Sequence, residues 1–260
     1  MNVLLINGSP QDNGNTNSIL EIFTQNIAKN KYDEQTCFTT IPLSNMAIEY
    51  CHGCRICFTK SEMLCPYKED IVSIKSRMIE ADIIIIGSPV YVEDVTGLVK
   101  NWIDRMAYNC HRPFLNGKPT YIFTTSGAMA SLHAIRTIKH AMMAWGAENV
   151  NYDNYSMGNK MEIKKAEMLY GKQIEKRVNE IFHIYNSKNI STYSLLAFNV
   201  QKQFWLRKNN AKEPYDYIYW IEQGWLNKDC LYYHPVKVNI FKKYIAKLMS
   251  KLVAIIMFSK

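Results

Sequence analysis

The sequence predicts an α/β fold in which a five-stranded parallel sheet carries helices on both faces. Short apolar runs alternate with segments whose apolar residues recur every three or four positions. One run, residues 83–86, consists of four consecutive isoleucines. A strand of this sequence has no polar face, which is typical of a strand that is covered on both faces of the sheet. Polar, glycine-containing segments separate the runs from the helical patterns. Five strands separated by helices indicate parallel pairing with crossover helices.

The elements alternate regularly along residues 1–186. The first strand is followed by a polar turn and then by a helix with Ile19, Phe23 and Ile27 on one face. Gly146 follows the fourth helix, as a C-cap glycine would. The expected strands are 3–6, 36–41, 82–86, 120–125 and 148–155. The expected helices are 16–29, 71–80, 97–107, 131–145 and 161–186.

Charge and aromatic residues divide the 260-residue chain into two parts. An apolar fraction of 48% with 21% charged residues excludes disordered and fibrous classes. Residues 1–187 carry 19 Lys and Arg against 19 Asp and Glu, whereas residues 188–260 carry 12 against 4 and so hold the whole net charge of +8. The second part also contains 14 of the 32 aromatic residues, which disordered segments lack. We expect a binding or catalytic domain over 1–187 and a basic, aromatic-rich extension over 188–260.

The apolar segments are too short for a membrane span or a signal peptide. The charge-free run 83–92 falls short of the roughly 20 residues that a membrane helix needs. The run 3–6 is too short for a signal-peptide core, and no basic region precedes it. We therefore expect a cytoplasmic protein.

The loop after the first strand has the composition of a phosphate site. It runs from Gly8 to Asn17, with glycines that allow tight turns and with hydroxyl and amide side chains at the start of the next helix. A helix N-terminus favours an anion because its N–H groups point outward. The loop lacks the Lys–Ser/Thr pair of a triphosphate loop and the G-x-G-x-x-G of a dinucleotide fold, so it favours a terminal monophosphate. The alternative is a polar turn that only caps the helix.

Two further loops favour a ligand site over a simple turn. In such sheets ligands bind beyond the carboxyl ends of the strands. Residues 87–92 (GSPVYV) combine apolar side chains with available backbone groups, which suits a planar ring that needs hydrogen bonds at its edge. Residues 124–128 (TTSGA) are small and polar, so they can approach a ligand closely.

These motifs resemble those of the NAD(P)H-dependent FMN reductase and iron–sulfur flavoprotein group of the flavodoxin-like superfamily. The matching segments are GSP at 8–10 with GNT at 14–16, GSPVY at 87–91, LVKNWIDR at 98–105 and TSG at 125–127. The resemblance covers about residues 1–185 and implies a flavodoxin-like fold that binds FMN. It also assigns roles: the FMN phosphate is held by Ser9, Asn15, Thr16 and Asn17, the isoalloxazine ring is contacted by Pro89, Val90, Tyr91 and Val92, and its far side is closed by Ser126 and Gly127.

Four of the seven cysteines are clustered, with Cys51, Cys54 and Cys57 in a Cys-x2-Cys-x2-Cys run and Cys65 nearby. In a cytosolic chain such clustering indicates metal or redox chemistry before disulfides. The run places three thiolates around a tight loop, as a four-iron cluster requires, and a more distant cysteine can complete the set. Zinc sites usually pair two separated arms, so the spacing favours iron–sulfur, while zinc and a redox thiol loop stay open. The run also looks like the cysteine motif of iron–sulfur flavoproteins, which implies one [4Fe-4S] cluster.

The resemblance implies an oxidoreductase in which NAD(P)H delivers a hydride to FMN and the reduced flavin passes electrons on. The acceptor is a small molecule, a protein or the adjacent cluster, and no side chain has to act as acid or base because the cofactor carries the chemistry. One alternative is an electron carrier fed by a ferredoxin, without a pyridine-nucleotide site. Another is a membrane-docked flavin-binding adaptor whose cysteines hold structural zinc. We expect a dimer and no nucleic-acid partner.

Residues 239–259 predict a basic amphipathic helix. Its apolar side comprises Phe241, Tyr244, Ile245, Leu248, Leu252, Ile255 and Ile256. Lys243, Lys247 and Lys251 recur every four residues on the other side. One expectation is that the apolar side packs onto the first domain or a second subunit. The other is a peripheral contact with an anionic membrane, at the inner face.

Overall fold

The computed structural model describes residues 1–29, 35–128, 132–187, 190–207, 214–236 and 238–258. Five parallel strands form one sheet in the order β2-β1-β3-β4-β5, which is the flavodoxin-like order and confirms the predicted fold class. The strands are β1 (Asn2–Asn7), β2 (Cys37–Pro42), β3 (Ile83–Pro89), β4 (Pro119–Ser126) and β5 (Glu148–Ser156). The largest difference from the expected bounds is at β3, which continues to Pro89 because it still pairs with Thr125 there.

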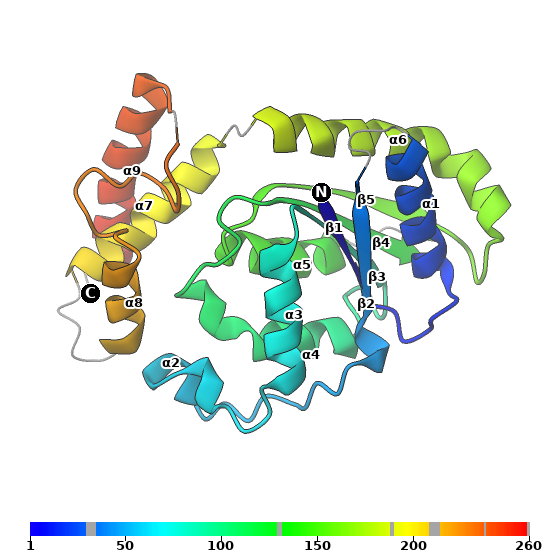
Figure 1. Cartoon of the computed structure of the whole chain (residues 1–260), viewed down its shortest axis with the longest axis horizontal. Helices are drawn as coiled ribbons and strands as arrows, with labels where there is room; N and C mark the ends of the chain where they lie inside the picture. Colours follow the sequence, from blue (N-terminus) through cyan, green and yellow to red (C-terminus); the bar gives the residue numbers. More distant parts are fainter. Residues whose placement is uncertain (30–34, 129–131, 188–189, 208–213, 237, 259–260) are drawn as a thin grey trace.

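Helices cover both faces of the sheet (Figure 1). One face carries α1 (Asn15–Lys29) and α6 (Ile163–Ser187), and the other carries α3 (Glu69–Glu80), α4 (Gly97–Arg105) and α5 (Leu132–Ala144). Successive side chains of a strand point to opposite faces. Accordingly, Val3 and Leu5 of β1 belong to the core under α1 and α6, whereas Leu4 and Ile6 belong to the opposite core.

The segment between β2 and α3 contains little regular structure and carries all four clustered cysteines. It consists of the 3-10 turn Leu43–Asn45, an extended stretch, the short helix α2 (Ile56–Thr59) and the 3-10 turn Glu62–Leu64. Gly53 and Arg55 have φ angles of 65° and 61°, so two residues of the cysteine run adopt left-handed backbone conformations. Another 3-10 turn, Ala107–Cys110, follows α4.

The extension forms a third core beside the sheet (Figure 1). Its helices are α7 (Thr192–Arg207), α8 (Pro214–Glu222) and α9 (Ile240–Phe258). The core consists mainly of aromatic rings: Phe198 stacks on Trp220 with ring centroids 5.5 Å apart, and Trp220 meets Trp225 edge-on at 5.1 Å. α8 lies against α2 and thus against the cysteine segment. Among the described helices, none is long and apolar enough to cross a membrane.

Candidate functional site

The loop after β1 packs tightly against β3 because Gly8 follows β1 and Gly87 lies near the carboxyl end of β3. The Gly8 N–H donates to the Gly87 carbonyl oxygen at 2.7 Å, and the Gly8 carbonyl accepts from the Thr96 hydroxyl at 2.7 Å. A Cβ at Gly87 would overlap the ring of Phe123, and one at Gly8 would overlap Val99. The close approach of these loops to each other and to α4 therefore requires both glycines.

The side chains predicted to hold phosphate lie at the N-terminus of α1, where they bond to neighbouring segments. Thr16 is buried, and its hydroxyl lies 2.9 Å from the hydroxyl of Thr125. The Asn15 amide donates to the Gly158 carbonyl at 3.2 Å, and its oxygen accepts from the Met161 N–H at 2.9 Å. These bonds fix the start of α1 against β4 and against the segment after β5.

Backbone N–H groups at this terminus can meet a ligand together with the polar side chains beside them. The first N–H groups of an α-helix have no intrahelical acceptors, and α1 begins at Asn15. The preceding loop is held by Ser9, whose hydroxyl oxygen accepts from the Gln11 N–H at 3.0 Å. Asn17 donates its amide to the Glu21 carboxylate at 2.6 Å. The arrangement offers neutral hydrogen-bond donors and the positive end of a helix dipole, which suits an anion.

The loop after β3 presents its side chains to solvent. The Val90 N–H donates to the Thr125 carbonyl at 2.8 Å, so Pro89 and Val90 stay beside the end of β4. Tyr91 and Asp94 then close a tight turn through two backbone hydrogen bonds of 2.8 and 3.1 Å. Val92 has a φ of 49°, a strained conformation for a β-branched residue, and its side chain is fully exposed, while Tyr91 is 48% exposed. Strain of this kind concentrates at functional loops.

Ser126 and Gly127 complete the edge at the end of β4. The Asn154 amide of β5 donates to the Ser126 hydroxyl at 3.3 Å, and the Gly158 N–H donates to the Gly127 carbonyl at 3.1 Å. A Cβ at Gly127 would meet no atom within 4 Å, so this residue borders open space. The hydrogen bonds among the four loops place all ten residues expected around the flavin along one edge of the sheet.

The four clustered cysteines line one cavity of about 340 Å³. Cys51 and Cys54 are exposed, whereas Cys57 and Cys65 are half-buried. Burial raises the pKa of the Cys57 thiol, and the neighbouring Cys51 adds to the increase. Within the described ranges, no three His, Cys, Asp or Glu side chains are arranged to hold a metal ion. The cysteines thus share a cavity, but their sulfur atoms do not converge on one point.

Helix α4 connects the carboxyl edge of the sheet to the cysteine cavity. Thr96, which contacts Gly8, caps its N-terminus. At its C-terminus the buried Arg105 donates to the Cys65 sulfur at 3.2 Å and to the Tyr67 carbonyl at 2.6 Å. Because α4 has nine residues and a helix rises about 1.5 Å per residue, the two regions lie roughly 13 Å apart along it.

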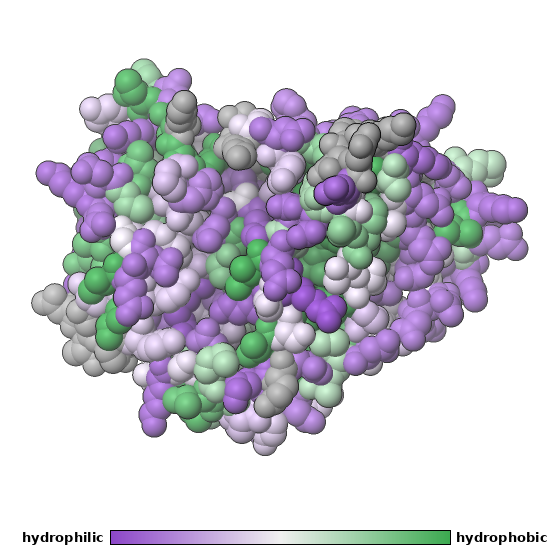
Figure 2. Space-filling model, in the orientation of Figure 1, coloured by the Kyte–Doolittle hydropathy of each residue, from purple (hydrophilic) through white to green (hydrophobic). Residues whose placement is uncertain are grey.

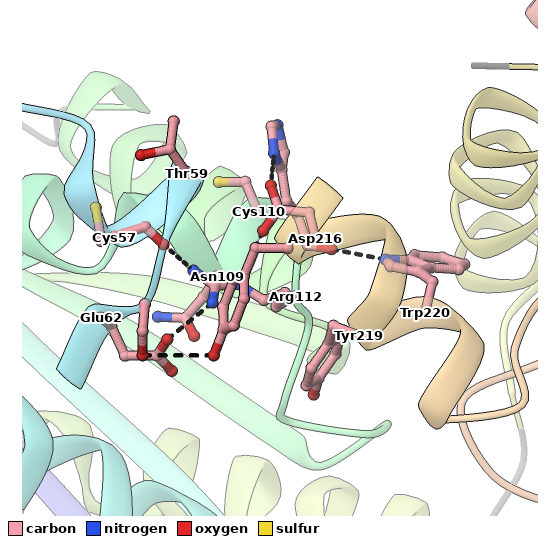
Figure 3. Close-up of polar contacts among 12 residues, drawn as sticks. Cys57, Thr59, Glu62, Asn109, Cys110, Arg112, Asp216, Tyr219 and Trp220 are labelled. Carbon is pink, nitrogen blue, oxygen red and sulfur yellow. Dashed lines mark hydrogen bonds and ion pairs between the residues drawn. The ribbon is translucent and has the colours of Figure 1, made fainter. Parts of the chain in front are cut away.

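A buried ion network joins the cysteine segment to the extension (Figure 3). Arg112 is 2% exposed and lies between two carboxylates, with nitrogen–oxygen distances of 2.8 Å to Glu62 and 3.0 Å to Asp216 of α8. Arg112 also donates to the Cys57 carbonyl. His111 lies 2.7 Å from the second oxygen of Asp216. One arginine thereby ties the cysteine run to a carboxylate that is separated from it by more than 150 positions in the sequence.

The charges of this network shift the pKa of its other members. Burial alone would raise the pKa of Glu62, but Lys75 and Arg112 together hold it below its ordinary value. Burial lowers the pKa of Lys75, although its ion pair with Glu62, at 3.1 Å, opposes that change. At neutral pH Glu62 is therefore ionised, and it neutralises part of the positive charge beside the cysteine cavity.

Sequence reasoning did not identify Arg105, Arg112 or Asp216. Arg105 ends the LVKNWIDR segment that carries part of the resemblance, so that motif was an available signal. Arg112 and Asp216 belong to no motif, and only the folded chain places them together. The segment after β5, where Gly158 and Met161 bond to Asn15, was also absent from the expected site.

Comparison with known proteins identifies the family. The model of the NADPH-dependent FMN reductase family matches residues 1–162. The chain belongs to this family. It is therefore an FMN-dependent oxidoreductase, as expected from the three loop motifs.

The chain is also similar to iron-sulfur flavoproteins, and its fold is shared by a solved structure. An iron-sulfur flavoprotein of Archaeoglobus fulgidus is 28% identical over 229 residues, covering 87% of this chain and 100% of that protein. A second iron-sulfur flavoprotein from the same organism is 39% identical over 105 residues, covering 40% of this chain and 48% of its own length. The structure of an oxidoreductase from Corynebacterium diphtheriae has the same fold, with a TM-score of 0.52 at 17% identity over 72% of this chain and 98% of the other.

Proposed function

We propose that the chain binds FMN at the carboxyl edge of its sheet, with the phosphate at the N-terminus of α1. The meeting of four loops at that terminus is the observation that carries the proposal. The donors there are neutral hydroxyls, amides and backbone N–H groups, which suit a terminal monophosphate. When bound, FMN supplies the redox chemistry by accepting a hydride and releasing electrons.

In this proposal the residues act by positioning. Ser9 and the first turn of α1 (Asn15, Thr16 and Asn17) hold the phosphate, partly through backbone N–H groups. Residues 89–92 contact the ring from the loop after β3, where Tyr91 and Val92 project outward. Ser126 and Gly127 lie at its far side, where the missing Cβ leaves room. No acid or base is required of these residues.

Two paired substitutions on α1 test the phosphate position. Thr16→Ala with Asn17→Ala should weaken FMN affinity by one to three orders of magnitude, since a hydrogen bond to a charged group contributes about 1.5–3 kcal/mol. Thr24→Ala with Asn26→Ala is the matched control, because these side chains lie further along the same helix and donate to carbonyls of α1 itself. Fluorescence titration with FMN measures both. Equal affinities in the two double variants would refute the placement.

NAD(P)H is the proposed electron donor, in line with the family's description, and a small molecule or a protein accepts the electrons. The FMN-loaded protein is expected to oxidise NADH or NADPH under anaerobic conditions, seen as bleaching of the flavin absorbance. If neither nucleotide bleaches it while reduced ferredoxin does, the chain is a ferredoxin-linked carrier instead.

We further propose that Cys51, Cys54, Cys57 and Cys65 hold one [4Fe-4S] cluster. Their common cavity and the contact of Arg105 with the Cys65 sulfur support this, because an iron–sulfur cluster with four thiolates is an anion. The sulfurs of Cys51 and Cys54 are on an exposed, irregular stretch and would have to move inward to ligate. Arg105 and Arg112 act as positioning residues that hold the backbone of this segment.

Anaerobic purification with iron, sulfide and zinc analysis tests the cluster. Cys54→Ala should lose iron and acid-labile sulfide while FMN remains, whereas Cys37→Ala, an exposed cysteine on β2, should retain both. Zinc without sulfide would support the adaptor with structural zinc. Absence of both metals from the wild-type protein would leave a redox thiol loop.

A homodimer is also proposed, with the exposed loop after β3 at or near the subunit contact. Val92 is fully exposed at the edge where the ring would lie, and an apolar side chain there is covered most simply by a second subunit. Sedimentation analysis should show a dimer that Val92→Asp weakens. A wild-type monomer would contradict it.

A further inference from the structure

Helix α9 contacts the rest of the chain through small side chains. It packs against α7, and its buried residues are Ala246 (2% exposed) and Ser250 (1% exposed). Small residues allow the two helices to approach closely without using the large apolar side chains of α9. The expected packing of its apolar side onto the first domain is therefore not what the structure shows.

The apolar side of α9 instead faces outward. Phe241 is 77% exposed, Leu248 64% and Leu252 53%. The side chains that share this face and are each at least 40% exposed are Phe241, Tyr244, Ile245, Leu248, Met249, Leu252, Ile255 and Ile256. Figure 2 shows apolar and hydrophilic side chains intermingled along the part of the molecular edge that carries this helix. A contiguous exposed apolar face of this kind marks an interaction surface.

Lysines border this face on both sides. At about 100° per residue, Lys247 and Lys251 fall along one margin and Lys242 along the other. Lys243 lies toward the side of α9 that packs against α7. Within the part of the chain that the structure describes, none of these four lysines forms an ion pair. Residues 240–258 contain no acidic residue to complement them.

We propose that α9 docks the protein on the surface of an anionic lipid bilayer, lying in the plane of the headgroups. The apolar face would enter the boundary between headgroups and acyl chains, and the lysines at its margins would reach the lipid phosphates. A second copy of the same face fits poorly, because two α9 helices would bring lysines together without any acid between them. An anionic bilayer offers an apolar region to the exposed apolar face and negative charge to the lysines at its margins.

Vesicle sedimentation of the full-length protein tests the proposal. Binding is expected to vesicles of phosphatidylcholine with phosphatidylglycerol, weakly or not at all to pure phosphatidylcholine, and to decrease with salt. Leu252→Asp should reduce binding at least tenfold, because it removes an apolar side chain from the buried face and adds a negative charge. Replacing Lys247 and Lys251 with Gln should reduce it about fivefold for each lysine.

Matched variants on α6 serve as controls. Leu169 is 53% exposed, as is Leu252, so Leu169→Asp introduces the same change at equal exposure and should leave vesicle binding unchanged. Lys164→Gln with Lys165→Gln controls for the loss of two exposed lysines. Circular dichroism checks that each variant is folded. Equal sedimentation of wild type and Leu252→Asp would overturn the proposal. So would a shift from dimer to monomer in Leu252→Asp without any vesicle binding by the wild type, since a second copy would then cover the face.

Discussion

The sheet region and the extension are stabilised by different kinds of core. Residues 1–187 bury aliphatic side chains on the two faces of a sheet, for example the isoleucines 83–86, which alternate between the two cores. Residues 188–260 bury stacked aromatic rings around Phe198 and Trp220. The first arrangement follows a regular period along the chain, whereas the second depends on rings that are far apart in sequence. The sheet region can therefore be predicted from its sequence, whereas the aromatic core of the extension cannot.

The contact between the two regions includes several buried or partly buried polar groups. The Trp220 indole N–H donates to the His111 carbonyl at 2.7 Å, and the Tyr232 hydroxyl donates to the Glu148 carboxylate at 3.3 Å. Asp216, which is fully buried, pairs with Arg112. The extension is therefore attached to the cysteine side of the sheet region through groups that are costly to leave without partners.

The largest expected effect is that of Asp216→Ala. Removing one partner of a buried ion pair leaves Arg112 partly uncompensated, which typically costs about 3–5 kcal/mol. We expect urea unfolding to show a loss of this size, with earlier unfolding of the extension. Asp229→Ala, at an exposed position in the same extension, should change stability by less than about 0.5 kcal/mol.

Joint replacement of the pair sharpens this test. Arg112→Met with Asp216→Leu removes both charges, so it should recover much of the stability lost in Asp216→Ala. If the double variant is as unstable as the single one, the contacts of Arg112 with Glu62 and the Cys57 carbonyl contribute as much as its ion pair with Asp216.

A smaller effect is expected within the sheet region at Gly87. Gly87→Ala would place a methyl group against Phe123 and Thr16, and overpacking of this kind costs about 1–3 kcal/mol. Gly87 also holds the loop after β1 in place at the carboxyl edge of the sheet, where FMN is proposed to bind. FMN affinity should therefore fall as well. Gly97→Ala is the control: nothing lies within 4 Å of its Cβ, and alanine favours a helix, so stability should stay the same or rise by up to about 1 kcal/mol.

The sequence predicted most of the sheet region because local rules determine it. The isoleucine run, the glycines Gly8 and Gly87 and the polar start of α1 are each recognisable within a few residues, and together they predicted which loops meet at the carboxyl edge of the sheet. The engagement of Asn15 with the segment after β5 was not predictable, since it joins residues separated by more than 140 positions. Arg112 and Asp216 show the same limit, because no local pattern distinguishes a buried ion pair from two surface charges. For α9 the pattern predicted the helix and its two sides, but it left open whether the apolar side packs inward or faces outward, as it does.

The smallest expected effect is that of Glu62→Gln. Glu62 is the carboxylate of the sheet region that pairs with Arg112. Glu62 is 20% exposed at its side chain and Asp216 is fully buried, so Glu62→Gln should cost only about 1 kcal/mol at pH 7. The pKa of Glu62 is held below its ordinary value of 4.5, so its contribution is complete above that pH and is lost as the pH falls through the lower folded-state value. Urea unfolding of wild type and Glu62→Gln should therefore differ at pH 7 and converge at strongly acidic pH. A difference that persists unchanged into the acid range would mean that the shape of Glu62, rather than its charge, holds Arg112 beside the cysteine run.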